Sequence, residues 1–206
     1  MKKAALVLLA TLFAFNLFAQ PDVFAQEIPK IRPASCPVIY LSTSTGINNA
    51  TGVVGFSFDV PVAEYVSIDA GTGLSSWGNK LYIGGRYYLK SCHRGMAISA
   101  GITRNTGVTD FQSDMETIYK PSEPVTLRLY PKTNILFAVY RYVTLGKRYN
   151  RFYFGGGWSQ NISGKQFKQF SGNQLSDNST NMINMRSPGG PMITAGFSFG
   201  YFRGDK

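Results

Sequence analysis

The sequence has little charge, few cysteines and almost no histidine, and each shortage excludes a class of protein. Charged residues make up 16% of the chain, against about 25% in an average soluble domain. The chain has 2 cysteines and 1 histidine, too few for the Cys/His clusters of a zinc site. The histidine, His93, lies in the short turn KSCHRG, where we expect a solvated side chain rather than the base of a Ser/His nucleophile. Asp110, Asp114 and Glu116 lack the spacing of a calcium loop and are interpreted as a solvated acidic loop. The sequence thus predicts no enzyme, no cofactor and no metal.

Long apolar runs are also missing. The apolar run AALVLLATLFAFNLFA at 4–19 carries no charge and has 16 residues, whereas a transmembrane helix needs roughly 20. A basic start, a short apolar core and a small-residue exit are typical of a secretory signal peptide. We therefore expect a signal peptide at 1–25, cleaved after Ala19 or Ala25, and a periplasmic segment at 26–36. The net charge is +10, but the basic residues do not form a contiguous stripe. We therefore expect no nucleic-acid partner for an exported chain.

No stretch after residue 25 has a helical period, and period-two segments recur instead, which indicates strands. Alternation is clearest at 52–60 and 191–202, where every second residue is apolar. The turn residues between the segments divide the chain into eight expected strands. They cover 37–45, 52–60, 64–74, 79–90, 94–104, 134–143, 150–160 and 191–202.

The connections between these strands differ in length. Those at 61–63, 91–93 and 144–149 are short, whereas 105–133 and 161–190 each hold about thirty residues. If consecutive strands are antiparallel, the short turns fall at one end of the sheet and the long loops at the other. An even strand number with this arrangement is the layout of an outer-membrane β-barrel, with the long loops facing outward. VTLRLY within the first long loop alternates as well, which is compatible with a strand extension.

The two sides of the strands differ in composition. In the hairpin at 82–102, isoleucine and tyrosine line one side, while glycine, serine and a single Arg86 line the other. A secreted, lipocalin-like barrel would need a charged exterior, and the small-residue face has too few charges for that. Such a face suits the side-chain-filled lumen of an eight-stranded barrel, and the apolar face suits lipid. The small-residue face comprises Gly55, Ser57, Asp59, Ser67, Asp69, Gly71, Gly84, Arg86, Ser99, Gly101, Thr103, Gly155 and Gly157.

Aromatic residues gather near the strand ends, as they do in the interfacial girdle of a membrane protein. We expect this girdle to comprise Tyr65, Trp77, Tyr87, Tyr140, Tyr142, Phe152, Trp158 and Tyr201.

The segments LYIGGRYYL, RFYFGGGW and ITAGFSFGYF resemble those of small bacterial outer-membrane β-barrel proteins of the eight-stranded type. The resemblance covers nearly all of the chain after the expected signal peptide, at 37–206. It implies an all-β, antiparallel, up-and-down transmembrane barrel, a location in the bacterial outer membrane and contact with outer-membrane lipid. It specifies architecture and location, but no activity.

The favoured function is that of a structural scaffold at the cell surface, binding a protein or glycan through its long loops. Our candidate contacts are Lys165, Phe167, Lys168 and Phe170 in GKQFKQF, because exposed aromatics beside cations mark interaction surfaces. A simple strand extension is the competing interpretation of this segment. Alternative functions are a small transport channel, a component of an envelope assembly and, less favoured, a lipid-modifying enzyme.

Two pairings follow from the expected topology. Asp69 and Arg86 lie on adjacent strands and on the same small-residue face, so we expect a lumen ion pair, because a buried charge is costly unless it is paired. Cys36 and Cys92 both fall at the periplasmic end. In an exported chain they either form a disulfide or remain two free thiols.

Overall fold

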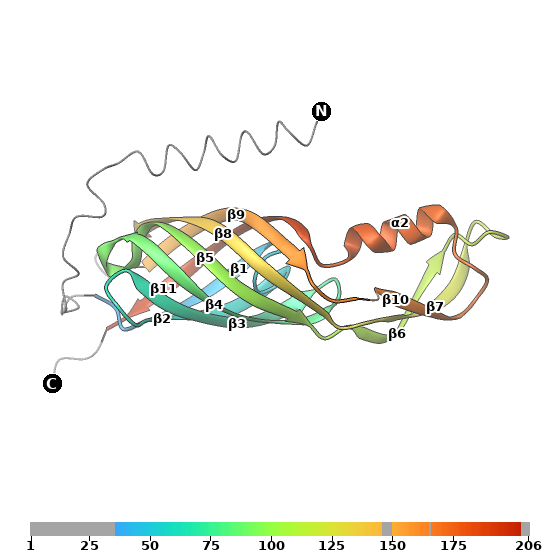
Figure 1. Ribbon diagram of the computed structural model, residues 1–206, viewed down its shortest axis with the longest axis horizontal. Coiled ribbons are helices and arrows are strands. Elements are labelled where there is room, and N and C mark those ends of the chain that lie inside the picture. Colours follow the sequence, from blue (N-terminus) through green and yellow to red (C-terminus); the bar gives the residue numbers. More distant parts are fainter. Residues whose placement is uncertain (1–35, 146–149, 165, 203–206) are drawn as a thin grey trace, which may run out of the picture. The chain divides into compact units, whose positions relative to one another are not determined.

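The computed structural model describes residues 36–145, 150–164 and 166–202, and its main feature is a closed antiparallel barrel of eight strands (Figure 1). Consecutive barrel strands pair with each other, and β1 pairs with β11 to close the ring. All eight predicted strands are confirmed, as is the all-β class. The expected signal peptide and most of the segment 26–36 lie outside the described residues. The barrel strands are β1 (Ile39–Ile47), β2 (Val54–Pro61), β3 (Val66–Ser75), β4 (Gly78–Lys90), β5 (Arg94–Asn105), β8 (Lys132–Leu145), β9 (Asn150–Asn161) and β11 (Gly190–Tyr201).

Alternation along each strand separates an outer surface from a lumen. In β4, the side chains of Tyr82 and Tyr88 are buried, whereas Ile83 is 60% exposed and Tyr87 is 43% exposed. Their register partners in β5 follow the same rule, because Ile102 lies opposite Ile83 and is also exposed. The small and polar residues therefore face inward and the apolar residues face outward, the reverse of a soluble domain.

Three residues expected in the aromatic girdle are inside the protein instead. Tyr140 and Tyr142 are buried in the lumen, and Trp77 is 1% exposed. The correction follows from strand phase, since Phe137 and Val139 of β8 are exposed and the next positions of the same parity must point outward as well. Position near a strand end did not determine the face. Of the other expected girdle residues, Tyr65 is half-buried, and Tyr87, Phe152, Trp158 and Tyr201 are exposed.

Glycines on the lumen face make room for tyrosine rings. Gly155 is the register partner of Tyr140, and a Cβ at Gly155 would come within 2.7 Å of the Tyr140 ring. Gly196 stands in the same relation to Tyr153, with a 2.5 Å approach. Such contacts are shorter than van der Waals distance, so each large ring requires a glycine on the neighbouring strand.

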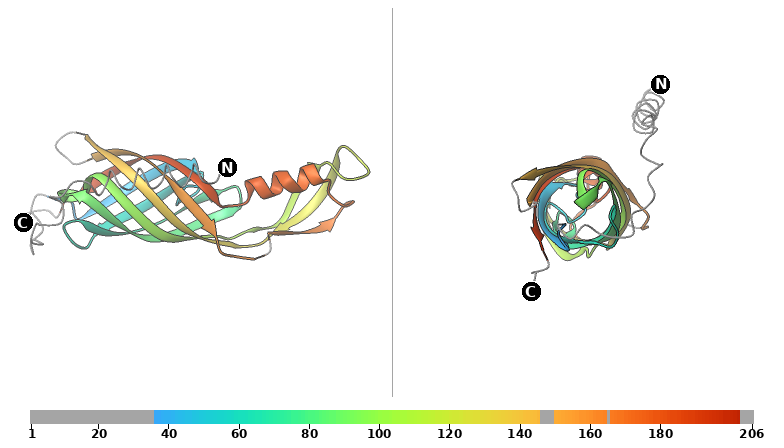
Figure 2. Two further views of the ribbon diagram at one scale, coloured as in Figure 1. Left: turned by 45° about the horizontal axis from the view of Figure 1, so that its top comes forward. Right: turned by 90° about the vertical axis from the view of Figure 1, so that its left-hand side faces the viewer.

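The two long connections form an ordered extension beyond one end of the barrel (Figure 2). Within it, β6 (Val108–Met115), β7 (Glu123–Leu129) and β10 (Phe167–Ser171) form a sheet in the order β10-β7-β6. VTLRLY lies in β7 and the first residue after it. The helix α2 (Asp177–Arg186) follows, with the Ser176 hydroxyl accepting a hydrogen bond from the backbone of Ser179 at its start. Among the described residues, no helix is long and apolar enough to cross a membrane.

The extension has its own apolar core, and one residue of the barrel belongs to it. Trp77, in the turn between β3 and β4, packs with apolar side chains of β7 and α2. Its indole Nε1 donates a hydrogen bond to the Tyr130 carbonyl at 2.8 Å. Trp77 therefore anchors the extension to the barrel. The buried core comprises Trp77, Val125, Leu127, Leu129, Leu175 and Ile183.

Replacing Trp77 with alanine should loosen the extension without opening the barrel. Removing a fully buried indole costs about 3–5 kcal/mol, and this loss falls on the contact between barrel turn and extension. We expect faster hydrogen exchange in 108–129 and 177–186, while the heat-modifiable gel shift of the barrel is retained. Trp158→Ala, at a residue 47% exposed on the barrel surface, is the matched control. Unchanged protection of the extension in Trp77→Ala would contradict the anchor.

Candidate functional site

The lumen is organised around the carboxylate of Asp59, which is 1% exposed. Arg86 Nη1 lies 3.3 Å and Arg151 Nη2 lies 3.1 Å from Asp59 Oδ2. The Tyr88 hydroxyl donates to the same oxygen. These groups come from β2, β4 and β9, on different sides of the ring. Asp59 therefore connects opposite walls of the barrel through charge-assisted hydrogen bonds.

The predicted pair of Asp69 and Arg86 is in contact in the structure. Arg86 Nη2 donates to Asp69 Oδ2, and the Tyr82 hydroxyl donates to Asp69 Oδ1 at 3.1 Å. Arg86 thus bridges two carboxylates, and its guanidinium also lies 4.8 Å from the ring centroid of Tyr140. Two arginines and two aspartates give this cluster a formal charge of zero, which offsets the cost of burying each ion.

Arg151 was not identified as a lumen residue from the sequence. Arg151 is 0% exposed and stacks on aromatic rings, with its Cζ 3.5 Å from the centroid of Tyr40 and 4.3 Å from that of Tyr142. The strand period indicated this position, because Arg151 is an even number of residues from Gly155 and Gly157 and therefore lies on the same small-residue face.

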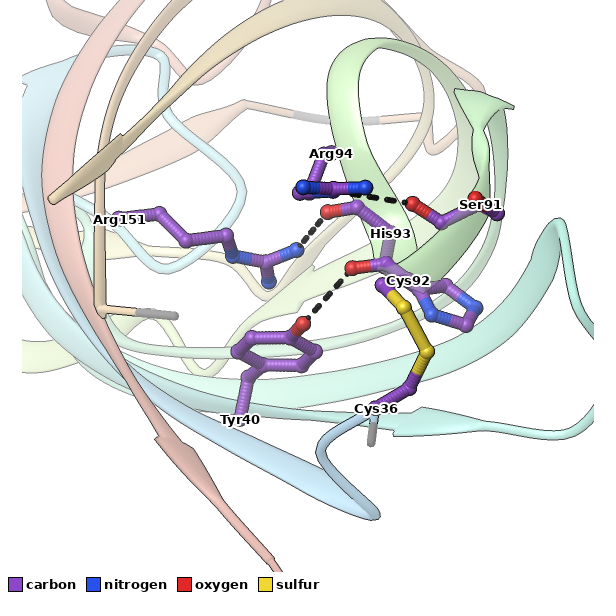
Figure 3. Close-up of a disulfide and its surroundings, with 7 residues drawn as sticks. All are labelled: Cys36, Tyr40, Ser91, Cys92, His93, Arg94 and Arg151. Carbon is purple, nitrogen blue, oxygen red and sulfur yellow. Dashed lines mark hydrogen bonds between the residues drawn. A yellow bond between two sulfur atoms is a disulfide. The ribbon is translucent and has the colours of Figure 1, made fainter. Parts of the chain in front are cut away.

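The turn between β4 and β5 folds into the barrel instead of standing in solvent (Figure 3). Cys92 is bonded to Cys36, with the two Cα atoms 5.1 Å apart. The Tyr40 hydroxyl donates to the Cys92 carbonyl at 2.9 Å, and Arg151 Nη1 donates to the His93 carbonyl. The expectation of a solvated His93 is wrong, because its side chain is 1% exposed and its ring meets that of Tyr88 edge-on at 4.8 Å. The turn closes this end of the lumen.

The opposite end is closed by the connection between β1 and β2. Asn49, Ala50 and Thr51 are all buried, at 2%, 5% and 2% exposure. The Thr51 hydroxyl lies 2.6 Å from the Ser44 hydroxyl of β1, and Asn49 Nδ2 donates to the same Ser44 oxygen at 2.9 Å. Side chains thus fill the middle of the barrel, and a chain segment covers each end.

The structure separates the predicted surface contacts. Phe167 is half-buried and packs against the apolar core of the extension. Phe170 is 56% exposed, and Lys168 Nζ lies 5.3 Å from its ring centroid. Lys165 lies outside the described residues. The segment forms β10, a strand of the sheet of the extension rather than a continuation of a barrel strand.

The register between β7 and β10 brings a further cation next to Lys168, which the sequence analysis did not predict. Arg128 of β7 lies directly opposite Lys168 of β10, and both side chains are exposed. The alternating pattern VTLRLY puts Arg128 on the polar side of its strand, but the pattern alone does not show that Arg128 lies beside Lys168. These two cations and Phe170 form what we name the basic face of the extension.

Hydrogen bonds hold the outer hairpin of the extension to the segment before α2. Asn173 Nδ2 donates to Glu123 Oε2 at 2.9 Å, and the Thr117 hydroxyl donates to the same oxygen at 3.2 Å. These donors stabilise the charged carboxylate and hold the pKa of Glu123 below its usual value. The backbone also pairs here, at the bridge between Thr117 and Leu175.

The acidic residues of the first long connection lie at its surface. Asp110, Asp114 and Glu116 are exposed. Across 36–145, 150–164 and 166–202, no group of three Asp, Glu, His or Cys side chains could hold a metal ion.

The fold and its lumen together define a closed antiparallel β-barrel with a filled interior. No family model matches the sequence, and no curated protein matches it. Among solved structures, the N-terminal β-barrel domain of OprF from Pseudomonas aeruginosa is similar, with a TM-score of 0.41 and 11% sequence identity. The similarity covers 79% of this chain and 95% of that chain. The strand pairing within this chain itself defines the closed barrel.

Breaking the lumen cluster at its centre should destabilise the barrel strongly. Asp59→Asn leaves two buried guanidinium groups short of a counter-charge, and breaking a buried pair costs about 3–5 kcal/mol. We expect that loss in urea unfolding of the protein refolded into lipid vesicles, with a smaller loss for Asp69→Asn, which pairs with Arg86 alone. Asp114→Asn, at an exposed site, should change stability by less than about 0.5 kcal/mol. Equal stabilities of Asp59→Asn and Asp114→Asn would show that the cluster is not structural.

Proposed function

We propose that this chain is an outer-membrane barrel that displays the extension as a binding scaffold at the cell surface. The observation that carries the proposal is the belt of exposed apolar side chains, to which every barrel strand contributes. Soluble monomers rarely expose contiguous apolar patches of more than a few hundred Å², so a belt around a whole barrel requires a covering, and lipid is the covering that surrounds all sides. The belt includes Leu41, Phe56, Ile68, Ile83, Ile98, Phe137, Phe154 and Phe199, which are 44–64% exposed.

The height of the belt agrees with a bilayer. Arg104 of β5 is exposed and lies opposite Thr133 of β8, and Arg141 of β8 is exposed further along the same strand. From 133 to 141 the strand rises roughly 26 Å at about 3.3 Å per residue. With a strand tilt of about 40°, the separation along the barrel axis is roughly 20 Å, close to the apolar band of about 25 Å in outer-membrane barrels. The two arginines therefore lie where headgroups would begin.

The filled lumen argues against the alternative of a transport channel. Asp59, Arg86 and Arg151 cross the interior, and buried segments cover both ends. An eight-stranded barrel has an interior just wide enough for such side chains. The barrel is thus better suited to anchoring than to conducting.

The extension supplies the surface that the barrel anchors. It consists of a sheet and a helix with their own buried core, fixed to the barrel through Trp77. Binding residues are often carried on segments positioned by a rigid scaffold. With Arg128, Lys168 and Phe170 on one face, the ligand favoured by charge is polyanionic.

The membrane assignment can be tested at the middle of the belt. Phe137 lies midway between Thr133 and Arg141 on β8 and is 57% exposed. Phe137→Arg should destabilise the vesicle-inserted protein by about 2–4 kcal/mol, the cost of an arginine at the bilayer midplane. Phe170→Arg is the matched control, because Phe170 is 56% exposed but lies on the extension. If both variants unfold at the same urea concentration, the belt does not face lipid.

The scaffold role can be tested with a charge-matched pair of double variants. Arg128→Ser with Lys168→Ser removes two cations from the basic face. Lys120→Ser with Arg186→Ser removes two cations elsewhere on the extension. Binding of the detergent-purified protein to immobilised dextran sulfate should weaken at least tenfold in the first double variant and by less than twofold in the second. Equal weakening would mean that only net charge acts, and it would refute the basic face as a site.

A further inference from the structure

Two buried lysines flank a buried asparagine at the extension end of the lumen. Lys80 of β4 lies opposite Asn105 of β5, and Asn105 lies opposite Lys132 of β8. The three residues are 2%, 0% and 0% exposed. Side chains directly opposite on adjacent antiparallel strands have Cβ atoms about 4.5–5.5 Å apart, so the three form a continuous row across the lumen wall. We name them the lysine row.

The ammonium groups of the lysine row have no carboxylate partner among the described residues. Lys80 Nζ donates to the Asn49 carbonyl at 2.7 Å, and Lys132 Nζ donates to the Gly164 carbonyl at 3.0 Å. The ion pairs of the cluster deeper in the lumen belong to Asp59 and Asp69. An ammonium has three donors and a full charge, and burying it without a counter-charge is expensive. The lysine row differs in this respect from the neutral cluster deeper in the lumen.

A further donor and a small cavity lie at the same place. Asn105 Oδ1 accepts a hydrogen bond from the Ser75 hydroxyl at 2.9 Å, while its Nδ2 has no partner in the described structure. Lys80, Asn105 and Ser75 line a cavity of about 30 Å³ together with Gly52 and Pro188. The charge beside this cavity is positive, and Asn105 Nδ2 is a hydrogen-bond donor without an acceptor.

We propose that Lys80 and Asn105 of the lysine row bind a compact inorganic anion of about the size of chloride in this cavity. The charge argument requires a negative group, since Lys80 lines the cavity and its ammonium has no carboxylate partner among the described residues. The volume decides its size, because a cavity of about 30 Å³ holds a small ion or one to two waters. The anion offsets one of the two lysine charges at the end of the lumen where no carboxylate of the described residues pairs with them.

The first experiment compares anions at constant ionic strength. The protein, folded in detergent micelles, is unfolded with urea in sodium chloride or in sodium gluconate, whose anion is too large for the cavity. Chloride at ten times its Kd should lower the unfolding equilibrium constant of the wild type about elevenfold relative to gluconate. Lys80→Met should reduce that ratio to less than twofold, while Lys120→Met, at an exposed lysine, should keep it. Equal responses to the two salts in the wild type would overturn the proposal.

A second variant supplies the missing charge from the protein itself. Asn105→Asp places a carboxylate between Lys80 and Lys132, where it occupies the position of the anion. This variant should be more stable than the wild type in gluconate, and its response to chloride should be lost. If Asn105→Asp keeps the full chloride response, the anion does not bind at the lysine row.

A third measurement applies even if Lys80→Met does not fold. Exchange of chloride with a protein site broadens its NMR line, so the wild type should broaden the line and Asn105→Asp should not. Equal broadening by these two proteins would contradict the site. Absence of broadening by the wild type, together with equal stability in both salts, would mean that the cavity holds water only.

Discussion

The structure depends on keeping charge neutral inside a closed ring of strands. Asp59 accepts from Arg86, Arg151 and Tyr88, and each of these groups would be costly to bury alone. Because the donors come from strands on different sides of the ring, the same carboxylate that balances charge also fixes the distances across the lumen. The tyrosine rings around the arginines then fill the remaining width, and glycines opposite them keep adjacent strands within hydrogen-bonding distance.

The filled lumen also explains why the ends of the barrel differ. At one end, Arg151 and Tyr40 bind carbonyls of the inward turn, so the cluster itself holds that closure in place. At the other end, Lys80 binds the Asn49 carbonyl and the closure meets uncompensated positive charge. The extension rises from this second end, and Trp77 joins it to the turn between β3 and β4. The barrel and the extension are thus linked by short contacts rather than by a flexible tether.

The barrel could be predicted from the sequence because its signal is local. Alternation with period two marks each strand, and turn length orders them, so the strand bounds were accurate. The face to which a residue points was harder to predict near strand ends. Tyr140, Tyr142 and Trp77 were therefore assigned to the surface because they are aromatic. The sheet of the extension was missed because β10 is short and its pairing with β7 joins residues about forty positions apart. The partners of Asp59 were missed for a related reason, since Arg151 reaches it across the lumen and neither period nor spacing encodes that contact.

The bond between Cys36 and Cys92 makes a covalent ring of the chain. The two residues are 56 positions apart, and the ring encloses all of β1, β2, β3 and β4. In the chain-entropy account, a crosslink that closes a loop of this length lowers the conformational entropy of the unfolded state. It thereby stabilises the folded protein by about 4 kcal/mol. Half of the barrel wall is therefore a closed loop of chain before the last strand arrives. When β11 pairs with β1, it therefore joins a strand whose start is covalently tied, through Cys36 and Cys92, to the turn after β4.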